Sequence, residues 1–409
     1  MKIQIIREGK VPPDSRVPIT PKQCHTIQDR YEGVDIQVAP SPNRCYSDEE
    51  YQAQDVTLRA DPSDCEIMMG VKEVPIDHLV SNKTYFFFSH TIKEQPYNRK
   101  LLLACMEKNI RLIDYEVLTN KNGKRVIAFG VFAGMVGAHN ALWTYGKRTG
   151  LIAMPRLRDL RDYAEAQEIY AGLTIPPIKI VLTGTGRVGR GAERVLLDMG
   201  IRQVTPEEFL HGTFNDFPVF TTLKPKHYAA RREQKVFNKQ DFYANPAAYD
   251  SIFRPYYQVA DVMINGIYWD NDAPAFFTKE EMRLPEFKIQ VIADVTCDIA
   301  PVSSIPSTLD ASTIARPVFG YDPETEQMTE AYQTRCVDMM TIDNLPNELP
   351  RDASRSFGEQ FMEKVLPEVI AEYRDGKNSK MLERATVCRD GKLGVHFDYL
   401  RNYVRGEGV

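Results

Sequence analysis

The sequence lacks the cysteine pairs and ligand clusters that would tie it to a disulfide framework or to a metal. No two cysteines lie within four residues of each other, so the chain has no CxxC redox or zinc pair. An odd number of scattered thiols in a long chain is typical of reduced cysteines in the cytoplasm. No ligand cluster for a metal is visible, so we expect no metal. The seven cysteines are Cys24, Cys45, Cys65, Cys105, Cys297, Cys336 and Cys388.

The sequence also lacks an excess of positive charge. Its 51 Lys and Arg residues stand against 56 Asp and Glu residues, which gives a net charge of −5. A surface that binds nucleic acid usually needs clustered Lys and Arg, so we expect no nucleic-acid partner. The N-terminal segment, residues 1–8, resembles a short strand and has no apolar core of a secretory signal. We therefore expect a cytoplasmic protein.

One stretch is long enough to be tested as a membrane span. Residues 126–146 contain no Asp, Glu, Lys or Arg, and about 20 apolar residues can cross a bilayer. Glycines, His139 and Asn140 interrupt this stretch, and Leu and Ile are nearly absent from it. We interpret it as a buried strand followed by a buried helix, and expect no membrane partner.

What the sequence does contain is an alternation of strand-like and helix-like patterns. A length of 409 residues suggests two or three domains. The alternation over the first 145 residues predicts a parallel sheet covered by helices. The predicted strands include 2–7, 34–38, 66–71, 84–88, 111–114, 178–183, 201–204, 219–223, 261–267 and 290–295, and the predicted helices include 22–30, 97–108, 132–149, 155–172 and 351–374.

The strongest local signal is a glycine motif, Gly184-x-Gly186-x-x-Gly189. It directly follows the predicted strand 178–183 and runs into a helical pattern. In that context glycines let backbone amides approach a pyrophosphate at the positive N-terminus of a helix. The plain alternative is an ordinary strand–turn–helix corner. The predicted strand before the motif and the helical pattern after it favour dinucleotide binding.

The acidic residue that usually accompanies such a loop is missing. About 20 residues on, a carboxylate should end the next strand and hold the adenosine ribose. Here that strand ends at Thr205. A later basic stretch, with Lys224, Lys226, Arg231 and Arg232, could meet a 2′-phosphate, although it could equally be a solvated loop. The sequence therefore leans slightly toward NADP, and NAD stays open.

Titratable side chains follow two predicted strands of the first region. Lys72 comes after the strand 66–71, and His90 comes after the strand 84–88. Ligands of a parallel sheet collect outside the carboxyl ends of its strands. A lysine and a histidine placed there could share proton transfer near neutral pH if burial lowers the lysine pKa. The pattern alone is also compatible with two surface residues.

Other charged residues are ambiguous from the pattern alone. Arg16 and Arg125 suit a bidentate grip on a substrate carboxylate, but most arginines are surface residues. Glu73 and Glu116 carry no distinguishing context. Asp298 follows the apolar strand 290–295, in the region where the nicotinamide end of a dinucleotide fold usually lies.

Several segments, in order along the chain, resemble a known enzyme family. They are similar to the lysine-ketoglutarate reductase half of α-aminoadipic semialdehyde synthase and, more distantly, to the single-chain, lysine-forming saccharopine dehydrogenases. Both groups are placed with alanine dehydrogenase and the transhydrogenase nucleotide-binding subunit. The resemblance runs from residue 1 to about residue 370. The matching segments are 83–93 (KTYFFFSHTIK), 111–116 (RLIDYE), 126–130 (VIAFG), 264–269 (INGIYW) and 341–346 (TIDNLP).

The resemblance implies a particular domain arrangement, because in that family the dinucleotide domain interrupts the substrate domain. We expect an α/β fold with two Rossmann-like, doubly wound parallel-sheet domains and an active site in the cleft between them. Residues 1–140 and 335–409 would form the discontinuous substrate domain, and residues 141–334 the dinucleotide-binding domain. The helix 132–149 and the helix after residue 351 would make the two crossings.

The resemblance also implies roles for the candidate residues. Lys72 and His90 resemble the catalytic acid/base pair. Arg16 and Arg125 resemble arginines that hold substrate carboxylates, and Glu116 resembles a carboxylate that tunes the pair. Glu73 matches the single-chain enzymes but not the fused reductase. The implied cofactor-binding residues are Gly184, Gly186, Arg187, Val188, Gly189, Lys224, Asp298, Asn344 and Leu345.

The reaction implied by the resemblance is the reductive condensation of L-lysine with 2-oxoglutarate to saccharopine, with NADPH or NADH as the reductant. The expected partners are these small molecules, together with a possible separate saccharopine-oxidising enzyme. Because the chain ends at Val409, we expect no release of glutamate from saccharopine. Two alternatives stay open: an alanine dehydrogenase-type enzyme that aminates a small 2-oxo acid, and a non-catalytic, transhydrogenase-like dinucleotide-binding subunit.

Overall fold

The computed structural model describes residues 1–233 and 237–406, and it divides the chain into two compact units. The first unit contains residues 1–128 together with the segment from Pro350 onward, and the second contains residues 129–349. The boundaries expected from the sequence were residues 140/141 and 334/335, and the last three residues of the expected substrate domain, 407–409, lie outside the described residues. The second unit extends to residue 349 because the strand β16 (Val337–Met340) pairs within its sheet.

The first unit is built on an eight-stranded sheet. Six parallel strands run in the order β3-β2-β1-β4-β5-β6, and β17 and β18 continue the sheet in antiparallel orientation. The strand order reverses at β1, so β1 and β4 flank the point where ligands of such sheets bind. The strands are β1 (Lys2–Ile5), β2 (Asp35–Val38), β3 (Thr57–Leu58), β4 (Ile67–Met69), β5 (Thr84–Phe87), β6 (Arg111–Asp114), β17 (Thr386–Arg389) and β18 (Lys392–Leu393).

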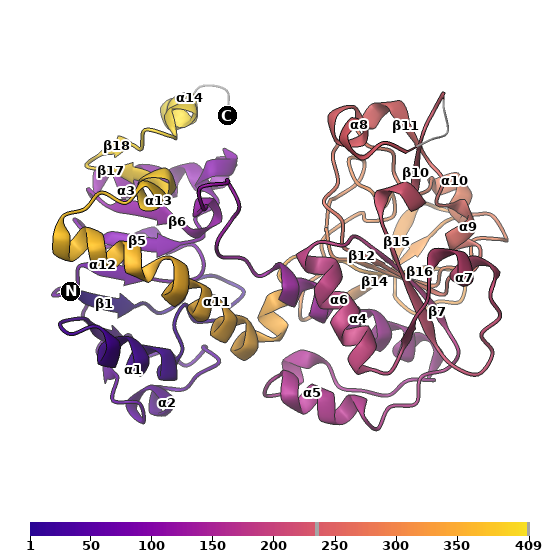
Figure 1. Ribbon diagram of the computed structural model, residues 1–409, viewed down its shortest axis with the longest axis horizontal. Helices are drawn as coiled ribbons and strands as arrows, with labels where there is room; N and C mark the ends of the chain where they lie inside the picture. The colour runs from indigo at the N-terminus through magenta and orange to yellow at the C-terminus, as the bar shows by residue number, and fades with distance from the viewer. Residues whose placement is uncertain (234–236, 407–409) are drawn as a thin grey trace. The chain divides into compact units, whose positions relative to one another are not determined.

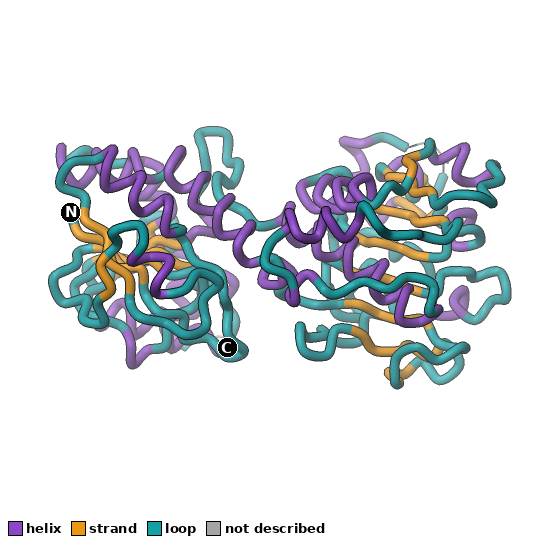
Figure 2. Tube along the Cα trace, turned by 90° about the horizontal axis from the view of Figure 1, so that it is seen from below, coloured by secondary structure: helices purple, strands orange, loops and turns teal. Residues whose placement is uncertain are grey.

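Helices cover both faces of this sheet (Figure 2). The helices α11 and α12, drawn in yellow, lie across strands drawn in indigo and purple, so segments from the two ends of the sequence lie side by side (Figure 1). Among the hydrogen bonds that join these segments, the Val17 amide donates to Ser354 Oγ at 2.9 Å, and Gln23 Nε2 donates to the Arg355 carbonyl at 2.8 Å. The helices are α1 (Pro21–Arg30), α2 (Asp48–Gln52), α3 (Arg99–Glu107), α11 (Pro350–Lys364), α12 (Leu366–Asp375), α13 (Lys380–Ala385) and α14 (Arg401–Arg405).

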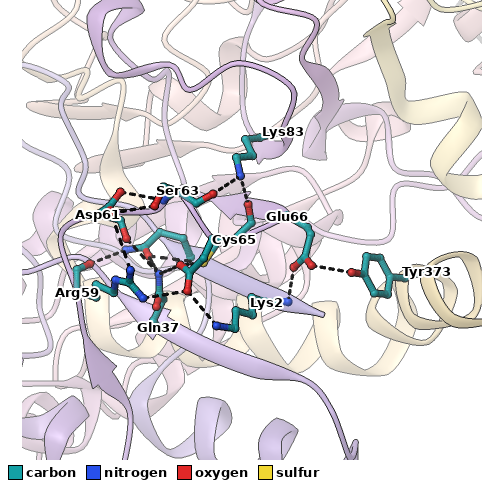
Figure 3. A network of polar contacts seen from close by, with 11 residues as sticks. Lys2, Gln37, Arg59, Asp61, Ser63, Cys65, Glu66, Lys83 and Tyr373 are labelled. Atoms are coloured by element: carbon teal, nitrogen blue, oxygen red, sulfur yellow. Dashed lines mark hydrogen bonds and ion pairs between the residues drawn. The ribbon is translucent and has the colours of Figure 1, made fainter.

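A polar network joins the amino ends of the strands in the first unit (Figure 3). The Lys2 amide donates to Glu66 Oε2 at 2.5 Å, and Lys2 Nζ donates to Asp64 at 2.9 Å. The other carboxylate oxygen of Glu66 accepts from the Tyr373 hydroxyl at 2.7 Å. Lys83 Nζ donates to the Cys65 carbonyl at 2.6 Å. These contacts tie β1, β4, β5 and α12 together at the edge opposite to the strand ends that carry the candidate residues.

The second unit contains another eight-stranded sheet. Its parallel strands run in the order β8-β9-β7-β12-β13-β16, and β14 and β15 follow in antiparallel orientation. Both sheets are therefore mixed, and the predicted α/β class with two Rossmann-like domains is confirmed. The remaining strands of this sheet are β7 (Lys179–Thr183), β8 (Arg202–Gln203), β9 (Val219–Leu223), β12 (Val262–Asn265), β13 (Val291–Asp294), β14 (Val318–Asp322) and β15 (Gln327–Thr329).

Two hydrophobic clusters lie on opposite faces of this second sheet. Ile180 and Leu182 of β7 belong to one cluster, which includes the helices α4 and α6, and Val181 between them belongs to the other. This alternation is what a strand buried on both faces requires. A small hairpin, β10 (Ala229–Arg231) with β11 (Tyr249–Ser251), lies in the insertion between β9 and β12. The helices are α4 (Gly130–Thr149), α5 (Tyr163–Tyr170), α6 (Arg187–Asp198), α7 (Pro206–His211), α8 (Lys239–Ala244), α9 (Arg254–Tyr257) and α10 (Lys279–Met282).

Glycines let α4 and α6 touch backbone to backbone. A Cβ atom on Gly134 would lie 1.9 Å from the Val188 carbonyl oxygen, and one on Gly191 would lie 1.9 Å from the Val131 carbonyl oxygen. Neither distance is compatible with a side chain. The glycine-rich, charge-free stretch 126–146 therefore provides a close helix crossing. No helix within residues 1–233 and 237–406 combines the length and the apolar character needed to cross a membrane.

Some elements differ from their expected bounds. The expected helix 155–172 is an α-helix only from Tyr163 to Tyr170, because Asp162 caps it by accepting hydrogen bonds from the Ala164 and Glu165 amides. The expected helix 351–374 is divided into α11 and α12 near Pro367, whose ring cannot continue a helix. The helix that follows the strand β7 begins at Arg187, inside the glycine motif itself.

Candidate functional site

The carboxyl ends of three neighbouring strands of the first unit carry most of its candidate residues. Lys72 follows β4, His90 follows β5, and Glu116 follows β6. These strands are adjacent and parallel, so their exits line one edge of the sheet. The sequence prediction that Lys72 and His90 stand at strand ends is therefore met by the structure, whereas their catalytic roles stay a prediction.

Lys72 lies in a partly buried, positively charged setting. Burial lowers the pKa of its amine, and the charges of Arg16 and Lys10 lower it further. The charges of Asp14 and Glu73 act in the opposite direction. The backbone amide of Lys72 donates to Glu8 Oε2 at 3.0 Å. A lysine with a lowered pKa can exchange a proton nearer to neutral pH than a solvated lysine can.

Glu73 and His90 form a short contact. The distance from His90 Nδ1 to Glu73 Oε1 is 2.5 Å, and Lys10 Nζ lies 3.2 Å from the other oxygen of Glu73. Burial raises the pKa of Glu73, but the hydrogen bond and charge of His90 and the charge of Lys10 lower it to about 2. Glu73 is therefore a carboxylate at any working pH. A charged carboxylate on Nδ1 orients the imidazole and leaves Nε2 as the nitrogen that a substrate would meet.

A buried carboxylate joins the exits of β5 and β6. Asp114 Oδ2 accepts from the Ser89 amide at 3.0 Å and from the Ser89 hydroxyl at 2.5 Å, and its other oxygen accepts from the Glu116 amide at 2.7 Å. Burial raises the pKa of Asp114 despite these bonds. His90 itself adopts a left-handed φ of 53°, which few residues other than glycine adopt. Asp114 thus fixes the turn that presents His90.

Glu116 and Arg125 form an ion pair at the same edge. Arg125 Nη2 lies 3.1 Å from Glu116 Oε1, and Lys93 Nζ lies 3.4 Å from the same oxygen. The side chain of Arg125 is half exposed, whereas that of Glu116 is largely buried. The guanidinium is therefore accessible for an incoming carboxylate while Glu116 holds its position.

Arg16 is placed differently from Arg125. Its side chain is only 3% exposed, and its Nε donates to Asp14 Oδ1 at 2.9 Å while Nη2 donates to Asp14 Oδ2 at 2.5 Å. This bidentate pair occupies one edge of the guanidinium. The clearest effect of Arg16 on the candidate site is its positive charge, which lowers the pKa of Lys72.

In the second unit, the glycine motif forms a tight turn between β7 and α6. Gly184 has a φ of +95°, and its amide donates to the Leu223 carbonyl at the end of β9. A Cβ on Gly189 would lie 2.0 Å from the Gly184 carbonyl oxygen, whereas a Cβ on Gly186 would meet nothing within 4 Å. Gly186 is the N-cap of α6, and Arg187 and Val188 begin that helix. The exposed space beside Gly186 fits the approach of a phosphate to the helix N-terminus.

Lys224 lies next to this turn because of the strand order. The strand beside β7 is β9 and not β8, although β8 follows β7 in the sequence. The position that usually carries the ribose-binding carboxylate is therefore the end of β9, where Lys224 stands exposed. Arg231 and Arg232, by contrast, are engaged in ion pairs with Asp241 and Asp250.

The remaining cofactor candidates occupy the exits of β13 and β16. Asp298 is partly buried, and burial together with the charge of Asp294 raises its pKa. Asp294 itself is fully buried and accepts from Asn265 Nδ2 at 3.0 Å and from the Thr308 hydroxyl at 2.7 Å, so it joins neighbouring strands. Leu345 is 2% exposed and belongs to the hydrophobic core of the second unit. Asn344 caps the short helix that begins at Leu345.

An aromatic pocket of about 120 Å³ lies between the segments that leave β9 and β12. Tyr228 and Phe276 belong to its lining and pack edge to face against each other, with ring centroids 4.9 Å apart. Tyr268 and Trp269 also line it, and Tyr268 is 92% exposed. The same two segments contact the glycine turn, since Gly184 approaches Gly266 and bonds to Leu223. The pocket is therefore close to the start of α6.

Sequence reasoning missed four acidic or basic residues of the first unit. Glu8, Lys10, Asp14 and Asp114 all contact the candidate residues, as described above. Asp114 and Glu8 carry nearly the same signal as Lys72, because Asp114 is the last residue of the predicted strand 111–114 and Glu8 comes directly after the predicted strand 2–7. That signal could have found both. Lys10 and Asp14 lie in a loop without regular structure, and no pattern marks them.

Within residues 1–233 and 237–406, no group of His, Cys, Asp and Glu has the arrangement of a metal site. The charged groups described above at the carboxyl edge of each sheet are carboxylates, amines and guanidinium groups, with the imidazole of His90 in the first unit. They suit proton transfer and the binding of carboxylates or phosphates.

Comparison with known proteins connects this geometry to named enzymes. Residues 4–136 match the family model described as alanine dehydrogenase/PNT, N-terminal domain. The chain is 30% identical over 434 residues to alpha-aminoadipic semialdehyde synthase, mitochondrial, of Mus musculus, which covers 95% of this chain and 46% of the mouse protein. The chain thus spans about half the length of that relative.

A second relative matches over nearly its whole length. The saccharopine dehydrogenase [NAD(+), L-lysine-forming] of Emericella nidulans is 25% identical over 410 residues, which is 94% of this chain and 95% of that protein. Among solved structures, L-alanine dehydrogenase superposes with a TM-score of 0.66 at 15% sequence identity and covers 98% of both chains. At that identity the likeness shows the fold alone.

Proposed function

We propose that this chain, a homologue of the lysine-forming saccharopine dehydrogenases and of alpha-aminoadipic semialdehyde synthase, condenses L-lysine with 2-oxoglutarate and reduces the product to saccharopine. The observation that carries the proposal is the edge of the first sheet, where Lys72, a Glu73–His90 pair and an accessible Arg125 stand together on neighbouring strands. The edge offers an acid, a base and a carboxylate-binding cation, which are the groups that this reaction needs.

The proton steps follow from these groups. The ε-amine of the substrate lysine must lose a proton before it attacks the keto carbon of 2-oxoglutarate, and Lys72 with its lowered pKa is the base that accepts this proton. His90, oriented by Glu73, donates a proton to the hydroxyl group that leaves the carbinolamine as water. When bound, the nicotinamide cofactor supplies the hydride that reduces the resulting imine.

The carboxylates of the two substrates need fixed partners. Arg125 is the accessible guanidinium at this edge, and Glu116 holds it in place. Arg16 serves mainly to depress the pKa of Lys72 from its buried position against Asp14. A substrate held in one orientation gains effective concentration at the reacting atoms, which is a large part of the rate advantage of an enzyme.

A substrate screen tests the proposal. Purified protein is mixed with NADPH or NADH and with lysine plus 2-oxoglutarate, with pyruvate plus ammonia, or with no substrate, and the absorbance of the reduced cofactor is followed. Consumption that requires both lysine and 2-oxoglutarate supports the proposal. Consumption with pyruvate and ammonia would identify an alanine dehydrogenase-type enzyme, and binding without turnover a non-catalytic subunit.

For the cofactor, the second unit favours NADPH. The end of β9 carries Lys224 at the position where an NAD-binding fold usually has a carboxylate. Lys226 is exposed two residues on. A lysine cannot accept hydrogen bonds from the ribose hydroxyls, but its ammonium group can bind a 2′-phosphate. The name of the Emericella nidulans relative specifies NAD(+), so the preference has to be measured on this chain.

Replacing Lys224 by Ser is expected to raise the KM for NADPH by about 10–150-fold, the worth of one charge-assisted hydrogen bond of about 1.5–3 kcal/mol. The KM for NADH should change little, because NADH has no 2′-phosphate. The matched control is Arg232→Ser, which removes an exposed cation already paired with Asp250. Steady-state kinetics with both cofactors provide the comparison. Equal changes for NADPH and NADH would mean that Lys224 does not contact the 2′-phosphate.

The aromatic pocket between the segments that leave β9 and β12 is a suitable site for the adenine ring of the cofactor. It is close to the glycine turn, and its rings can stack on a flat base. Replacing Tyr268 by Ala is expected to weaken NADPH binding by about 5–150-fold, since stacking of a base on an aromatic ring is worth about 1–3 kcal/mol. Binding of reduced nicotinamide mononucleotide, which has no adenine, should not change. Fluorescence titration measures both, and Tyr97→Ala, an exposed tyrosine of the first unit, is the control.

A further inference from the structure

The loop that follows β1 reaches the backbone just after β4 through one carboxyl group, that of Glu8. Glu8 Oε1 accepts from the Val71 amide at 2.5 Å, and Glu8 Oε2 accepts from the Lys72 amide at 3.0 Å. The two carboxyl oxygens of Glu8 thus accept hydrogen bonds from the amides of two consecutive residues. The contact is with the backbone of Lys72 and leaves its amine free to act elsewhere.

The peptide that Glu8 holds is also fixed from the other side. The Phe88 amide, at the end of β5, donates to the Val71 carbonyl at 3.0 Å. Val71 is therefore bound through its N–H by the loop after β1 and through its C=O by the neighbouring strand. The absence of a side chain at Gly70 makes room for this arrangement, because a Cβ there would lie 2.9 Å from Ile6 Cδ1 and 3.3 Å from Glu8 Oε1.

A negative charge on Glu8 is costly, and its raised pKa keeps the carboxyl group mostly protonated at neutral pH. Both oxygens can still accept a backbone hydrogen bond in that state. Burial raises the pKa of Glu8, the two backbone hydrogen bonds lower it, Asp14 raises it and Arg16 lowers it, and the result is about 8. Tyr115 faces Glu8 from the exit of β6, and its buried hydroxyl has no hydrogen-bond partner in the part of the chain that the structure describes. Burial of a carboxyl group at a strand exit costs free energy unless its polar atoms make hydrogen bonds.

We propose that Glu8 is a positioning residue that clamps the Val71–Lys72 turn and so holds the amine of Lys72 in its working place. The inference rests on the proposed catalytic role of Lys72. The following residue, Glu73, is the partner of His90, so the turn that Glu8 clamps leads directly into the second half of the acid/base pair. The same loop supplies Lys10, which binds the other oxygen of Glu73.

The chain offers a matched control at the opposite edge of the same two strands. Glu66, which immediately precedes β4, accepts from the Lys2 amide at 2.5 Å (Figure 3). Glu8 and Glu66 are therefore both carboxylates that join β1 to β4 through a backbone amide. Only Glu8 does so next to Lys72. Glu8→Gln and Glu66→Gln remove comparable bonds, and they differ in whether the candidate site is affected.

The expected result for Glu8→Gln is a fall in kcat of about 10–100-fold with an unchanged Kd for the cofactor. The amide of Gln presents a donor to one of the two backbone amides, which are donors themselves, so one half of the clamp is lost. Glu66→Gln should keep kcat within a factor of about two. On a Lys72→Met background, Glu8→Gln should cause no further loss, because it acts through Lys72. If Glu8→Gln does not fold, Glu8→Asp, which is one methylene shorter, is measured for the same split between kcat and cofactor Kd.

A second measurement is independent of turnover. The rate at which an amine-selective reagent modifies Lys72 is followed by mass spectrometry of the folded protein. Glu8→Gln should change that rate several-fold, and Glu66→Gln should not. An unchanged rate in Glu8→Gln, or equal changes in both variants, would overturn the proposal. If the rate changes as expected in a protein that shows no activity with lysine and 2-oxoglutarate, then the positioning role stands and the proposed function fails.

Discussion

Replacing Lys72 by Met is expected to lower kcat by about 10²–10⁴, the usual worth of a general acid or base. Met keeps the length and much of the volume of the Lys side chain, but it cannot accept or donate a proton. Lys72 is partly buried, and its amine makes no contact on which the hydrophobic core depends, so the variant should fold. The Kd for NADPH should stay near that of the wild type, because the glycine motif is in the other unit.

The lowered pKa of Lys72 predicts how the pH profile of kcat/KM should change in this variant. Burial and the charges of Arg16 and Lys10 lower the pKa of Lys72, so in the wild type the neutral amine is lost as the pH falls. The acid limb of the kcat/KM profile should therefore weaken or disappear in Lys72→Met. His90→Gln should lower kcat by a similar factor, and the double variant should be far less than additive if the two residues act as one unit.

The control for Lys72 is a lysine of the same sheet. Lys2→Met removes an exposed amine at the opposite edge, where Lys2 pairs with Asp64. Its kcat and pH profile should match the wild type. A Lys72→Met protein with near-normal turnover and an unchanged pH profile would show that the proton chemistry is elsewhere, and Glu116 and Asp298 would be the next candidates.

The second large effect is expected at the glycine motif, where replacement of Gly189 and replacement of Gly186 should differ in their effect on thermal stability. Gly189→Ala places a Cβ 2.0 Å from the Gly184 carbonyl oxygen, so the turn must shift. Such overpacking costs about 1–3 kcal/mol and should lower the Tm by about 2–12 °C. Gly186→Ala has open space around its Cβ and an ordinary φ of −79°, so its Tm should not change.

Cofactor binding should nevertheless be weaker in both variants. The Cβ of Gly186→Ala would stand at the exposed N-cap of α6, where the pyrophosphate approaches the backbone amides, and removal of such charge-assisted bonds costs about 10–150-fold in affinity. Gly172→Ala is the control, because its nearest neighbour is 3.7 Å away and it lies outside the motif. Calorimetry gives the Tm, and fluorescence titration gives the Kd. Normal NADPH binding by Gly186→Ala would show that the pyrophosphate does not use this helix terminus.

The parts of the fold that could be predicted from the sequence are those with local patterns. The strand β6 (Arg111–Asp114) has its expected bounds, and β1, β4 and β5 begin within one residue of theirs. The positions of Lys72 and His90 follow from the same patterns, because any residue directly after a parallel strand lies at the carboxyl edge. The glycine motif was recognisable because three glycines at two fixed spacings agreed with the strand before them and the helix after them.

The parts that could not be predicted depend on contacts between distant residues. Glu8 bonds to amides 63 and 64 residues further along the chain, and nothing near Glu8 indicates that. The importance of Lys224 as a strand-end residue depends on β9, rather than β8, being the neighbour of β7, and that order is a property of the sheet. The short β17 pairs with β6 in antiparallel orientation and was absent from the predicted strands.

The pairing of β17 with β6 has a consequence for the synthesis of the chain. Arg111 at the start of β6 and Thr386 of β17 are 275 residues apart. At about 5–20 residues per second, a ribosome needs roughly 14–55 s to make that interval. During this time β6 is an open edge, and α11 and α12, which cover one face of the sheet, have not yet been made. The second unit, which is continuous in sequence, can fold first. Until β17, α11 and α12 are made, the nascent first unit has an open strand edge and an uncovered sheet face, and these are the surfaces that a chaperone would protect.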